Sequence, residues 1–429
     1  MSSEHDAGRP WEESKRRLVP ATVVGGMIEW YDIAIYAQAS ALVFGRLFFP
    51  ALSPGTATLA SLATFGAGFA ARPVGALVLG PLGDRYGRKF VLVATILMMG
   101  IATTLIGALP TYAAIGVWAP ALLVFLRFVQ GLGVGSEYAG AVTLLAEYAP
   151  ARRRGFFSAV PAAGLLLGIG GAAAVSAALT ALPEDALLSW GWRLPFLLSI
   201  TLVGVGLFVR LRVLESPVFT STGARRKLPL VEAVRGAPRR LALATTTNGH
   251  VTFASQILQV FVLAYLAQRG VRASTGLIGL ILAAVVGSAA VLAVATAGDR
   301  LGRRPVYLGT QVAMALTPFP LFLLLDTGRP VLIWLGMVAT FGAIAASIGV
   351  QAAYLAELFS TRYRVTGYAL AREIPTGLLG APAPLIAAAL TAAAGGRPWP
   401  TAALMTVVGC AGVAAAARLP ETRGADMSR

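Results

Sequence analysis

Three residues near the start of the chain have the types and the spacing that suit proton binding. Glu29, Asp32 and Tyr36 stand at i, i+3 and i+7, so on a helix two carboxylates and a phenol share one face. Burial and mutual repulsion both favour the protonated form of a carboxyl group, whereas a nearby arginine favours the ionised form. We predict that Glu29 and Asp32 take up a proton with an affinity that changes when Arg72 or Arg127 moves. The alternative is a permanent charged brace between helices.

Arg127 is the first candidate for binding an anion. A guanidinium group stays charged and can hold a carboxylate through two parallel hydrogen bonds. The alternative is that Arg127 pairs permanently with Asp32 or Glu29, which leaves no donor for a ligand. Glu137 follows ten residues later, nearer the predicted cytoplasmic side, and could pass the proton inward. It could instead serve helix packing, because the glycines around it suit the close approach of a neighbouring helix.

Polar side chains in the second half of the chain could complete a binding site. Gln256 and Gln259 are three residues apart on a predicted helix, where they could donate hydrogen bonds to a carboxylate or to hydroxyl groups. Hydrogen bonds between helices are their alternative role. Arg372 lies within an apolar run and could bind an anion or be neutralised by Glu373. The remaining members of the predicted binding set come from the first half: Arg127 and Tyr36.

These ionisable residues belong to a chain that is otherwise strongly apolar. Apolar residues make up 57% and charged residues 13% of the sequence, and the mean hydropathy is +0.74. Such a composition leaves too little polar surface for a soluble globule. Each charge within the bilayer costs about 2.5–3.5 kcal/mol on insertion scales, so we expect these residues to be functional or paired. Apolar runs long enough to span a bilayer are 19–49, 56–80, 90–109, 116–148, 156–181, 190–211, 241–267, 274–297, 306–325, 331–357, 365–393 and 399–418.

The runs predict an all-α integral membrane protein with twelve transmembrane helices in two six-helix bundles. We assign residues 1–17 to an N-terminal tail and 18–211 to the first bundle. Residues 212–240, rich in Arg and Lys, form a linker with room for a short surface helix, 241–418 form the second bundle, and 419–429 form a C-terminal tail.

Lysine and arginine are distributed unequally between the two sides of the predicted membrane. With the N-terminus inside the cell, 26 of the 35 basic residues fall in cytoplasmic segments, three lie within helices, and six lie in outer loops: Arg46, Arg193, Arg269, Arg272, Arg329 and Arg397. Since cytoplasmic loops keep an excess of these residues, we expect a multi-pass protein of the plasma membrane with both termini cytoplasmic. The net charge of +16 then reflects topology and contact with anionic lipids rather than nucleic acid.

Cysteine and histidine are scarce. One cysteine, Cys410, excludes a disulfide within the chain, and two histidines, one of them in the polar tail, cannot build a zinc site. We therefore expect no metal and no cofactor, with the proton as the coupling ion. No nucleophile paired with a base and no phosphate-binding loop is recognisable, so an enzyme is not expected either.

A short loop motif occurs twice, about half the length of the 429-residue chain apart. Gly83 to Lys89 and Gly298 to Arg304 both follow the pattern Gly-Asp-Arg-x-Gly-Arg, which indicates a duplicated chain. Glycine permits a tight turn between helices, and the charged residues can cap and pair with neighbouring helix ends. We predict that they form a conformational gate, with a fixed structural turn as the alternative. The predicted gate residues are Asp84, Arg85, Arg88, Asp299, Arg300 and Arg303.

The repeated loops resemble the signature loop of the major facilitator superfamily, and other landmarks resemble its metabolite:proton symporter family. Most of the chain is covered, and the first half is most similar to the shikimate-transporter branch. Two segments depart from the pattern: Ala295-Thr296-Ala297, and Arg372-Glu373. The landmarks are Glu29-Trp30-Tyr31-Asp32, Ala71-Arg72-Pro73-Val74-Gly75, Arg127-Phe128-Val129-Gln130-Gly131, Glu147-Tyr148-Ala149-Pro150, Trp190-Gly191-Trp192-Arg193 and Leu214-Glu215-Ser216-Pro217.

The resemblance implies a secondary active transporter that takes up a small organic acid, such as a shikimate-like or dicarboxylic metabolite, together with protons. It also implies alternating access between two halves. We expect the protein to act as a monomer. Three alternatives remain open at this point: a betaine or proline symporter, a proton-driven drug exporter, and a membrane sensor without transport. Charged residues inside the membrane argue against the exporter, which usually has an apolar cavity.

Overall fold

A computed structural model describes residues 9–86, 88–133, 137–212, 229–361, 363–425 and 427. Side chains are described outside 9–17, 76–92, 137, 209–212 and 229–231. Regular structure in these ranges is helical. Ten of the described helical stretches are long and apolar enough to cross a membrane, and two further helices, at 54–86 and 88–108, bring the spans to the twelve of the predicted fold.

The first half consists of six spans and short helices that connect them. Leucine, alanine and valine dominate the spans, and such runs bury their backbone polar groups in intrahelical hydrogen bonds as lipid requires. The helices are α2 (Arg9–Leu42), α3 (Phe44–Phe48), α4 (Pro54–Tyr86), α5 (Arg88–Ala108), α6 (Tyr112–Ile115), α7 (Trp118–Gly133), α8 (Glu137–Tyr148), η1 (Ala151–Arg153), α9 (Arg154–Leu179), α10 (Glu184–Ser189), η2 (Gly191–Arg193) and α11 (Leu194–Arg212).

The second half repeats this plan after a linker. Two of its spans contain a π-helical segment, η4 and η5, and such segments often occur at functional sites. The helices are α12 (Pro229–Gly236), α13 (Pro238–Gln256), η4 (Ile257–Phe261), α14 (Val262–Gln268), α15 (Ala273–Leu301), α16 (Arg303–Leu316), α17 (Pro318–Asp326), α18 (Pro330–Leu358), α19 (Arg364–Pro375), η5 (Thr376–Gly380), α20 (Ala383–Ala393) and α21 (Trp399–Ala416).

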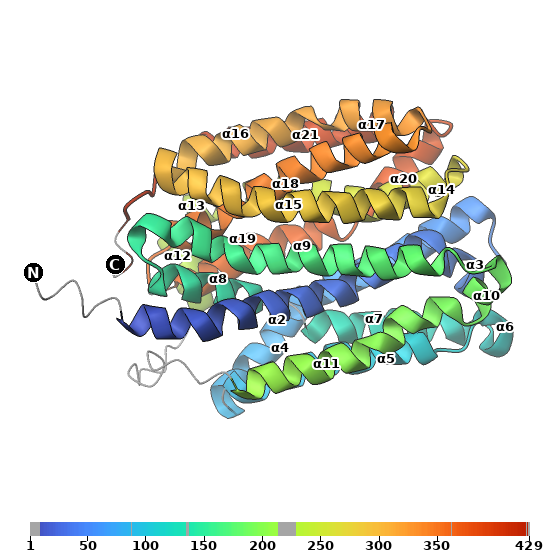
Figure 1. Ribbon diagram of the computed structural model, residues 1–429, viewed down its shortest axis with the longest axis horizontal. Coiled ribbons are helices and arrows are strands. Elements are labelled where there is room, and N and C mark those ends of the chain that lie inside the picture. Colours follow the sequence, from blue (N-terminus) through green and yellow to red (C-terminus); the bar gives the residue numbers. More distant parts are fainter. Residues whose placement is uncertain are drawn as a thin grey trace, which may run out of the picture.

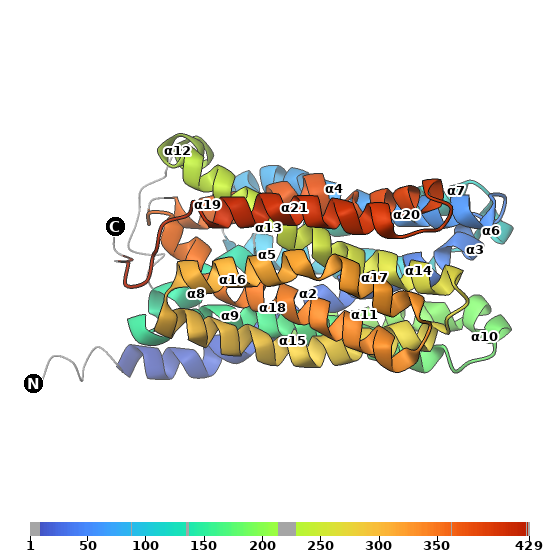
Figure 2. The same cartoon turned by 90° about the horizontal axis from the view of Figure 1, so that it is seen from above.

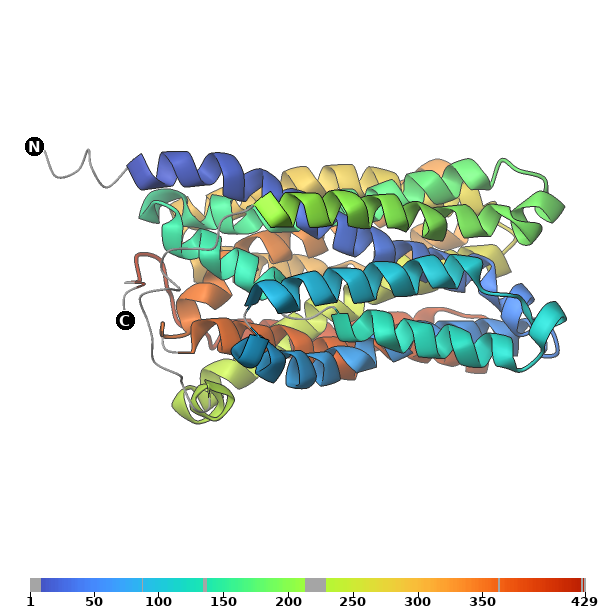
Figure 3. The same ribbon diagram turned by 90° about the horizontal axis from the view of Figure 1, so that it is seen from below.

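The spans run roughly along the long axis of the molecule, and the start of α2 and the end of the chain lie at one end of it (Figure 1). We call this the terminal end, and α12 lies there too (Figure 2). The short helices α3, α6 and α10 lie at the opposite end. Seen from below, the blue to green helices of the first half lie in front of the orange and red second half (Figure 3).

The two halves meet along several helix pairs. Helix α9 packs against α15 and α18, α4 packs against α20 and η5, and α2 packs against α14 and η4. Helix α8 reaches α18 and α19. The central helices of each half therefore enclose the space between the halves.

Three details differ from the predicted helix limits or refine them. Helix α2 begins at Arg9, inside the segment assigned to the tail, because Glu, Lys and Arg favour helix before the apolar run starts. Within the fourth run the structure describes α7 and α8, and residues 134–136 lie outside the described part. The second repeated loop is a tight turn, as predicted: Gly302 has φ +107°, which suits glycine, and it joins α15 directly to α16.

Candidate functional site

A cavity of about 50 Å³ lies between the halves. That volume holds only a few water molecules, so a larger solute requires side chains to move apart. The segments around it belong to both halves and include the last residues before η4 and the first residue of η5. The lining side chains are Trp30, Phe69, Arg72, Tyr138, Leu165, Leu166, Ile169, Asn248, Val251, Thr252, Ser255, Gln256, Phe341, Ile348, Gln351, Leu355, Tyr368, Arg372 and Thr376.

Arg72 lies between two carboxylates, one from each half of the protein. Its Nη2 is 3.5 Å from Glu29 Oε1 on α2, and its Nε is 3.4 Å from Glu373 Oε2 on α19. All three side chains are at least nine-tenths buried. Neither nitrogen forms a hydrogen bond with any residue in the described part of the chain. The Arg72–Glu373 pair therefore connects the halves in the middle of the bundle, but without the directional hydrogen bonds of a tight brace.

Asp32 is fully buried within the first half, away from these ion pairs. Its carboxylate accepts hydrogen bonds from Ser199 Oγ at 2.6 Å and from Thr103 Oγ1 at 3.3 Å. Neutral hydroxyl groups rather than an ion-pair partner bond this carboxylate, so it can bind a proton without the loss of an ion pair. The structure thus places Asp32 and Glu29, which share one helix face in the sequence, in different surroundings.

Arg127 and Tyr36 are not among the residues that line the central cavity. The Arg127 guanidinium hydrogen-bonds the Gln130 side chain and lies over the Tyr36 ring, 4.2 Å from its centroid. Tyr36 in turn donates a hydrogen bond to Thr64 Oγ1 at 2.7 Å. Arg127 lines a separate space of about 10 Å³, and Phe69 and Arg72 border both spaces. These two side chains separate Arg127 from the cavity.

The other predicted binding residues come from the second half. Gln256 and Arg372 line the cavity, and the Arg372 guanidinium lies 3.7 Å from the centroid of the Tyr138 ring. Gln259 is buried and donates a hydrogen bond to Ser255 Oγ at 2.6 Å, so Ser255 rather than Gln259 faces the cavity. Of the predicted binding set, the structure brings Gln256 and Arg372 together at the cavity.

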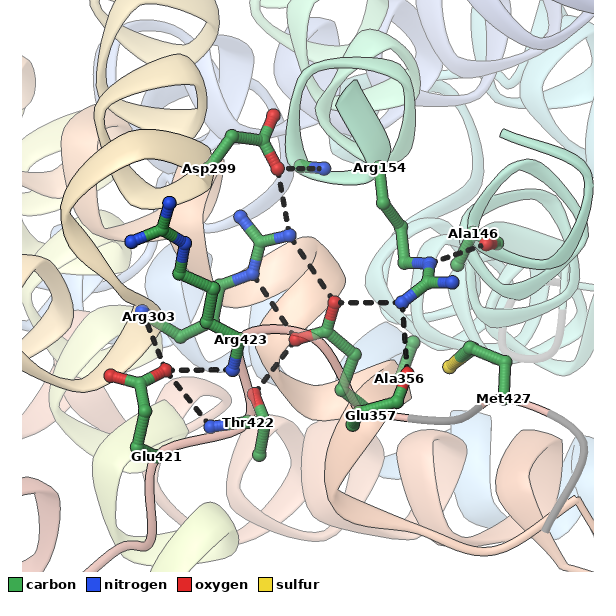
Figure 4. A network of polar contacts seen from close by, with 12 residues as sticks. Ala146, Arg154, Asp299, Arg303, Ala356, Glu357, Glu421, Thr422, Arg423 and Met427 are labelled. Carbon is green, nitrogen blue, oxygen red and sulfur yellow. Dashed lines mark hydrogen bonds and ion pairs between the residues drawn. The ribbon is translucent and has the colours of Figure 1, made fainter. Parts of the chain in front are cut away.

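A polar network connects the halves at the terminal end (Figure 4). Asp299, in the last turn of α15, accepts hydrogen bonds from the backbone N–H groups of Gly155 at 2.8 Å and Phe156 at 3.0 Å. These groups belong to the first turn of α9, where unpaired N–H groups favour a negative charge. Arg303 pairs with Asp299 at 2.8 Å and, through its Nε, with Glu357 at 3.1 Å. The second repeated loop therefore holds the start of a helix from the other half.

Two arginines make reciprocal contacts across the halves in this network. Arg154 Nε donates to Ala146 O at 3.1 Å, and its Nη1 lies 3.6 Å from Glu357 in the second half. Arg364 Nε donates to Ala356 O at 3.1 Å, and its Nη1 bonds Glu147 in the first half at 2.8 Å. The duplicated halves thus exchange equivalent ion pairs.

The sequence carried a signal for this pair of arginines that our sequence analysis missed. Ala146-Glu147 precedes Arg154 by the same interval as Ala356-Glu357 precedes Arg364, so the arrangement is a second repeated motif. By contrast, the cavity residues Tyr138 and Tyr368 have no such signal, because single tyrosines on long helices do not reveal which residues they face.

The C-terminal segment lies across the terminal end and completes the network. Glu421 accepts hydrogen bonds from the backbone N–H groups of Arg303 at 2.9 Å and Arg304 at 3.2 Å, at the start of α16. Partial burial acts to raise the pKa of Glu421, but backbone hydrogen bonds, foremost from Arg423, outweigh it and lower the pKa below its ordinary 4.5. Thr422 Oγ1 donates to Glu357 at 2.7 Å.

The remaining predicted residues are placed as follows. Arg300 is exposed on α15, outside the network. The side chains of Glu137, Asp84, Arg85 and Arg88 lie outside the described part of the structure. Their roles stay predictions.

The ion pairs at the opposite end have a different arrangement. Arg46 pairs with Glu184 within the first half, and Arg269 pairs with Asp326 within the second half, at 3.5 Å. Among the described residues, the ion pairs that connect the halves are those of Arg72 in the middle of the bundle and of Arg154 and Arg364 at the terminal end. Among the described residues, ion pairs therefore connect the halves at the terminal end but not at the opposite end.

Comparison with known proteins places this arrangement in a family. The family model described as "Sugar (and other) transporter" matches residues 18–229. The shikimate transporter of Escherichia coli (strain K12) is 36% identical, and the alignment covers 96% of this chain and 95% of the relative. The inner membrane metabolite transport protein YhjE of the same organism is 36% identical, with 87% of this chain and 88% of the relative covered.

Solved structures show the same fold. The proton:xylose symporter XylE of the major facilitator superfamily, bound to 6-bromo-6-deoxy-D-glucose, superposes with a TM-score of 0.76 at 18% sequence identity. The alignment covers 96% of this chain and 97% of that structure. The predicted twelve-helix fold and the predicted family are both confirmed, and the relatives are transporters rather than enzymes. The chain is a multi-pass membrane transporter that belongs to the major facilitator superfamily.

Proposed function

We propose that this transporter takes up a small organic acid together with protons, by alternating access between its halves. The observation that carries the proposal is the central cavity, which two arginines from different halves, Arg72 and Arg372, line. A guanidinium group recognises a carboxylate through parallel charge-assisted hydrogen bonds. The cavity also offers hydroxyl and amide groups for a polyhydroxylated acid, and a shikimate transporter is among the relatives.

The coupling ion in this proposal is the proton, and Asp32 and Glu29 are its acceptors, with Glu137 as a further candidate. Asp32 is fully buried and bonded to neutral hydroxyls, so protonation would relieve the cost of a buried charge. One proton moving inward across about 100 mV supplies roughly 2.3 kcal/mol. That energy supports roughly fortyfold accumulation of the solute.

Both termini face the cytoplasm of a plasma membrane in this proposal. The excess of Lys and Arg on the terminal side supports it, and one relative is named an inner membrane protein. The network at the terminal end would then close the cytoplasmic side, and Asp299 and Arg303 would act as gate residues that part when this side opens.

A zwitterionic osmolyte is the second candidate substrate. Aromatic rings of Trp30, Phe69 and Tyr138 line the cavity, and aromatic faces bind quaternary ammonium groups. Relatives include an ectoine/proline transporter of Corynebacterium glutamicum, 35% identical over 86% of this chain. Such a solute also carries a carboxylate, so it would use the same arginines.

Uptake into proteoliposomes with an imposed inward proton gradient tests the proposal. Labelled shikimate, a dicarboxylate and glycine betaine are compared for wild type, Asp32→Asn, and Asp185→Asn as a control on the exposed surface. We expect accumulation of an acid by wild type and by the control. Asp32→Asn should abolish accumulation against a gradient but keep exchange of labelled for unlabelled solute. Outward movement of a bulky lipophilic cation, without uptake of any acid, would support an exporter instead.

A further inference from the structure

Arg72 lines the cavity, and two of its three guanidinium nitrogens, Nε and Nη2, have no hydrogen-bond partner among the described residues. The residue is 3% exposed, and its side chain borders the cavity. Its Nε and Nη2 approach Glu373 and Glu29 at ion-pair distance, yet in the described structure neither makes a hydrogen bond. Glu373 Oε2 is also buried without a hydrogen-bond partner among these residues. Unmade hydrogen bonds of buried charged groups are costly, so a better partner for Arg72 would be strongly favoured.

We propose that Arg72 binds the carboxylate of the substrate. In the absence of substrate, the Glu373 carboxylate occupies the position beside Arg72 that the substrate carboxylate would take. The inference deepens the proposed function and rests on it. A carboxylate that enters from the cavity can approach the Arg72 fork in the plane of the guanidinium and form two hydrogen bonds. The Glu373 carboxylate, fixed to α19, meets Arg72 Nε at 3.4 Å without forming one. The incoming carboxylate would therefore form the two hydrogen bonds with Arg72 that Glu373 does not form.

The exchange would have a mechanical consequence. Arg72 lies on α4 of the first half, and Glu373 lies on α19 of the second half, three residues before η5. Replacement of Glu373 by substrate breaks the ion pair between the halves in the middle of the bundle. A ligand moves a conformational equilibrium only through a difference in affinity between states, and loss of this pair supplies such a difference. Substrate binding would thus loosen the contact between α4 and α19.

Arg127, the other buried arginine of the first half, is less suited to this role. Its Nε is also buried without a hydrogen-bond partner among the described residues, but its Nη1 donates to Gln130, and the Tyr36 and Phe65 rings cover the guanidinium, 4.2 and 5.0 Å from their centroids. Phe69 and Arg72 lie between it and the cavity. A substrate in the cavity would therefore meet Arg72, which lines it, rather than Arg127, which does not.

The test measures KM for uptake of labelled shikimate in proteoliposomes, with shikimate methyl ester and glycine betaine as competitors. We compare Arg72→Gln, Arg72→Lys, Glu373→Gln and Arg127→Gln with wild type, and use Arg46→Gln on the exposed surface as the control. Arg72→Lys keeps the charge but loses the fork, so it remains informative if Arg72→Gln fails to fold. Thermal unfolding of each purified variant monitors folding.

We expect Arg72→Gln to abolish uptake and Arg72→Lys to raise KM by about tenfold or more. Glu373→Gln should lower KM, because the internal competitor is gone, and glycine betaine but not the uncharged ester should compete. Uptake by Arg72→Gln at the wild-type KM, or loss of uptake by Arg127→Gln alone, overturns the inference while the proposed function stands. If wild type transports no carboxylate-bearing solute, the proposed function fails and this inference fails with it.

Discussion

The carboxylate of Asp299, in the second half, accepts a hydrogen bond from the backbone N–H of Gly155, in the first half, at 2.8 Å. The bond joins the last turn of α15 to the first turn of α9. The N-terminus of α9 favours the negative charge of Asp299. Arg303, at the start of α16, forms an ion pair with the same carboxylate. A repeated loop in the sequence thus serves as a contact between the halves.

Removing the Asp299 carboxylate should open the terminal end. Asp299→Ala deletes both hydrogen bonds to α9, each worth about 1.5–3 kcal/mol, so the open population should rise by about a hundredfold or more. A cysteine introduced by Ser158→Cys, at a fully buried position of α9, reports the opening through its rate of labelling. The background carries Cys410→Ser, because Cys410 is exposed.

Asp299→Asn keeps one acceptor oxygen and should label at an intermediate rate. Asp185→Asn, a change on the exposed surface, should label as slowly as the parent. Equal labelling rates for Asp299→Ala and the parent would show that this bond does not hold the terminal end closed.

A methyl group at Gly155 should have a similar effect for a steric reason. A Cβ at this position would lie 2.8 Å from both Ala295 O and Asp299 Oδ1, closer than carbon and oxygen atoms tolerate. We expect Gly155→Ala to push α9 away from α15 and to speed labelling in the same assay. Gly171→Ala in the same helix is the matched control, since its Cβ would meet no atom within 4 Å. Slow labelling of both variants would contradict the prediction.

The buried ion pairs of Glu357 should contribute to stability far more than an exposed pair does. Its carboxylate accepts from Arg303 Nε at 3.1 Å and lies 3.6 Å from Arg154, with 1% of the side chain exposed. Breaking a buried pair leaves an uncompensated charge, so Glu357→Gln should lower the free energy of unfolding by about 3–5 kcal/mol.

Glu184→Gln provides the control for Glu357, because its pair with Arg46 is about two-thirds exposed. That substitution should cost no more than about 1 kcal/mol. Denaturant unfolding in detergent micelles measures both values. Similar costs for the two variants would mean that the Glu357 network contributes little to stability.

The contribution of Glu421 should depend on pH in a defined direction. Backbone hydrogen bonds hold its pKa below 4.5 in the folded protein. A carboxyl group whose pKa is lower in the folded than in the unfolded state contributes its full stabilisation at a pH above its unfolded-state pKa. This contribution is lost as the pH falls through the folded-state pKa. The stability difference between wild type and Glu421→Gln should therefore be constant above about pH 4.5 and shrink below it.

Thermal unfolding of both proteins across this pH range makes the comparison. Arg418→Gln, on the exposed end of the same segment, should leave the pH dependence as in wild type. A difference that grows as the pH falls would be opposite in sign to the prediction.

The sequence by itself determined the membrane class, the twelve spans, the duplication and the family, because these depend on local features. Run length decides whether a helix can span a bilayer, and a repeated motif such as the one at Gly298 is visible without coordinates. Residue spacing also established that Glu29 and Asp32 share one helix face.

Only the tertiary structure decided which partner each of these residues meets. Spacing defines a face of a helix but not the neighbour that covers it, so Glu29 contacts Arg72 whereas Asp32 meets Ser199 and Thr103. Arg127 lines a space separate from the central cavity, with Phe69 bordering both, because of how α4 and α7 pack against each other. The pairs that cross between halves, such as Glu373 with Arg72, depend on how two separately folded bundles come together, and no local pattern in the sequence contains that information.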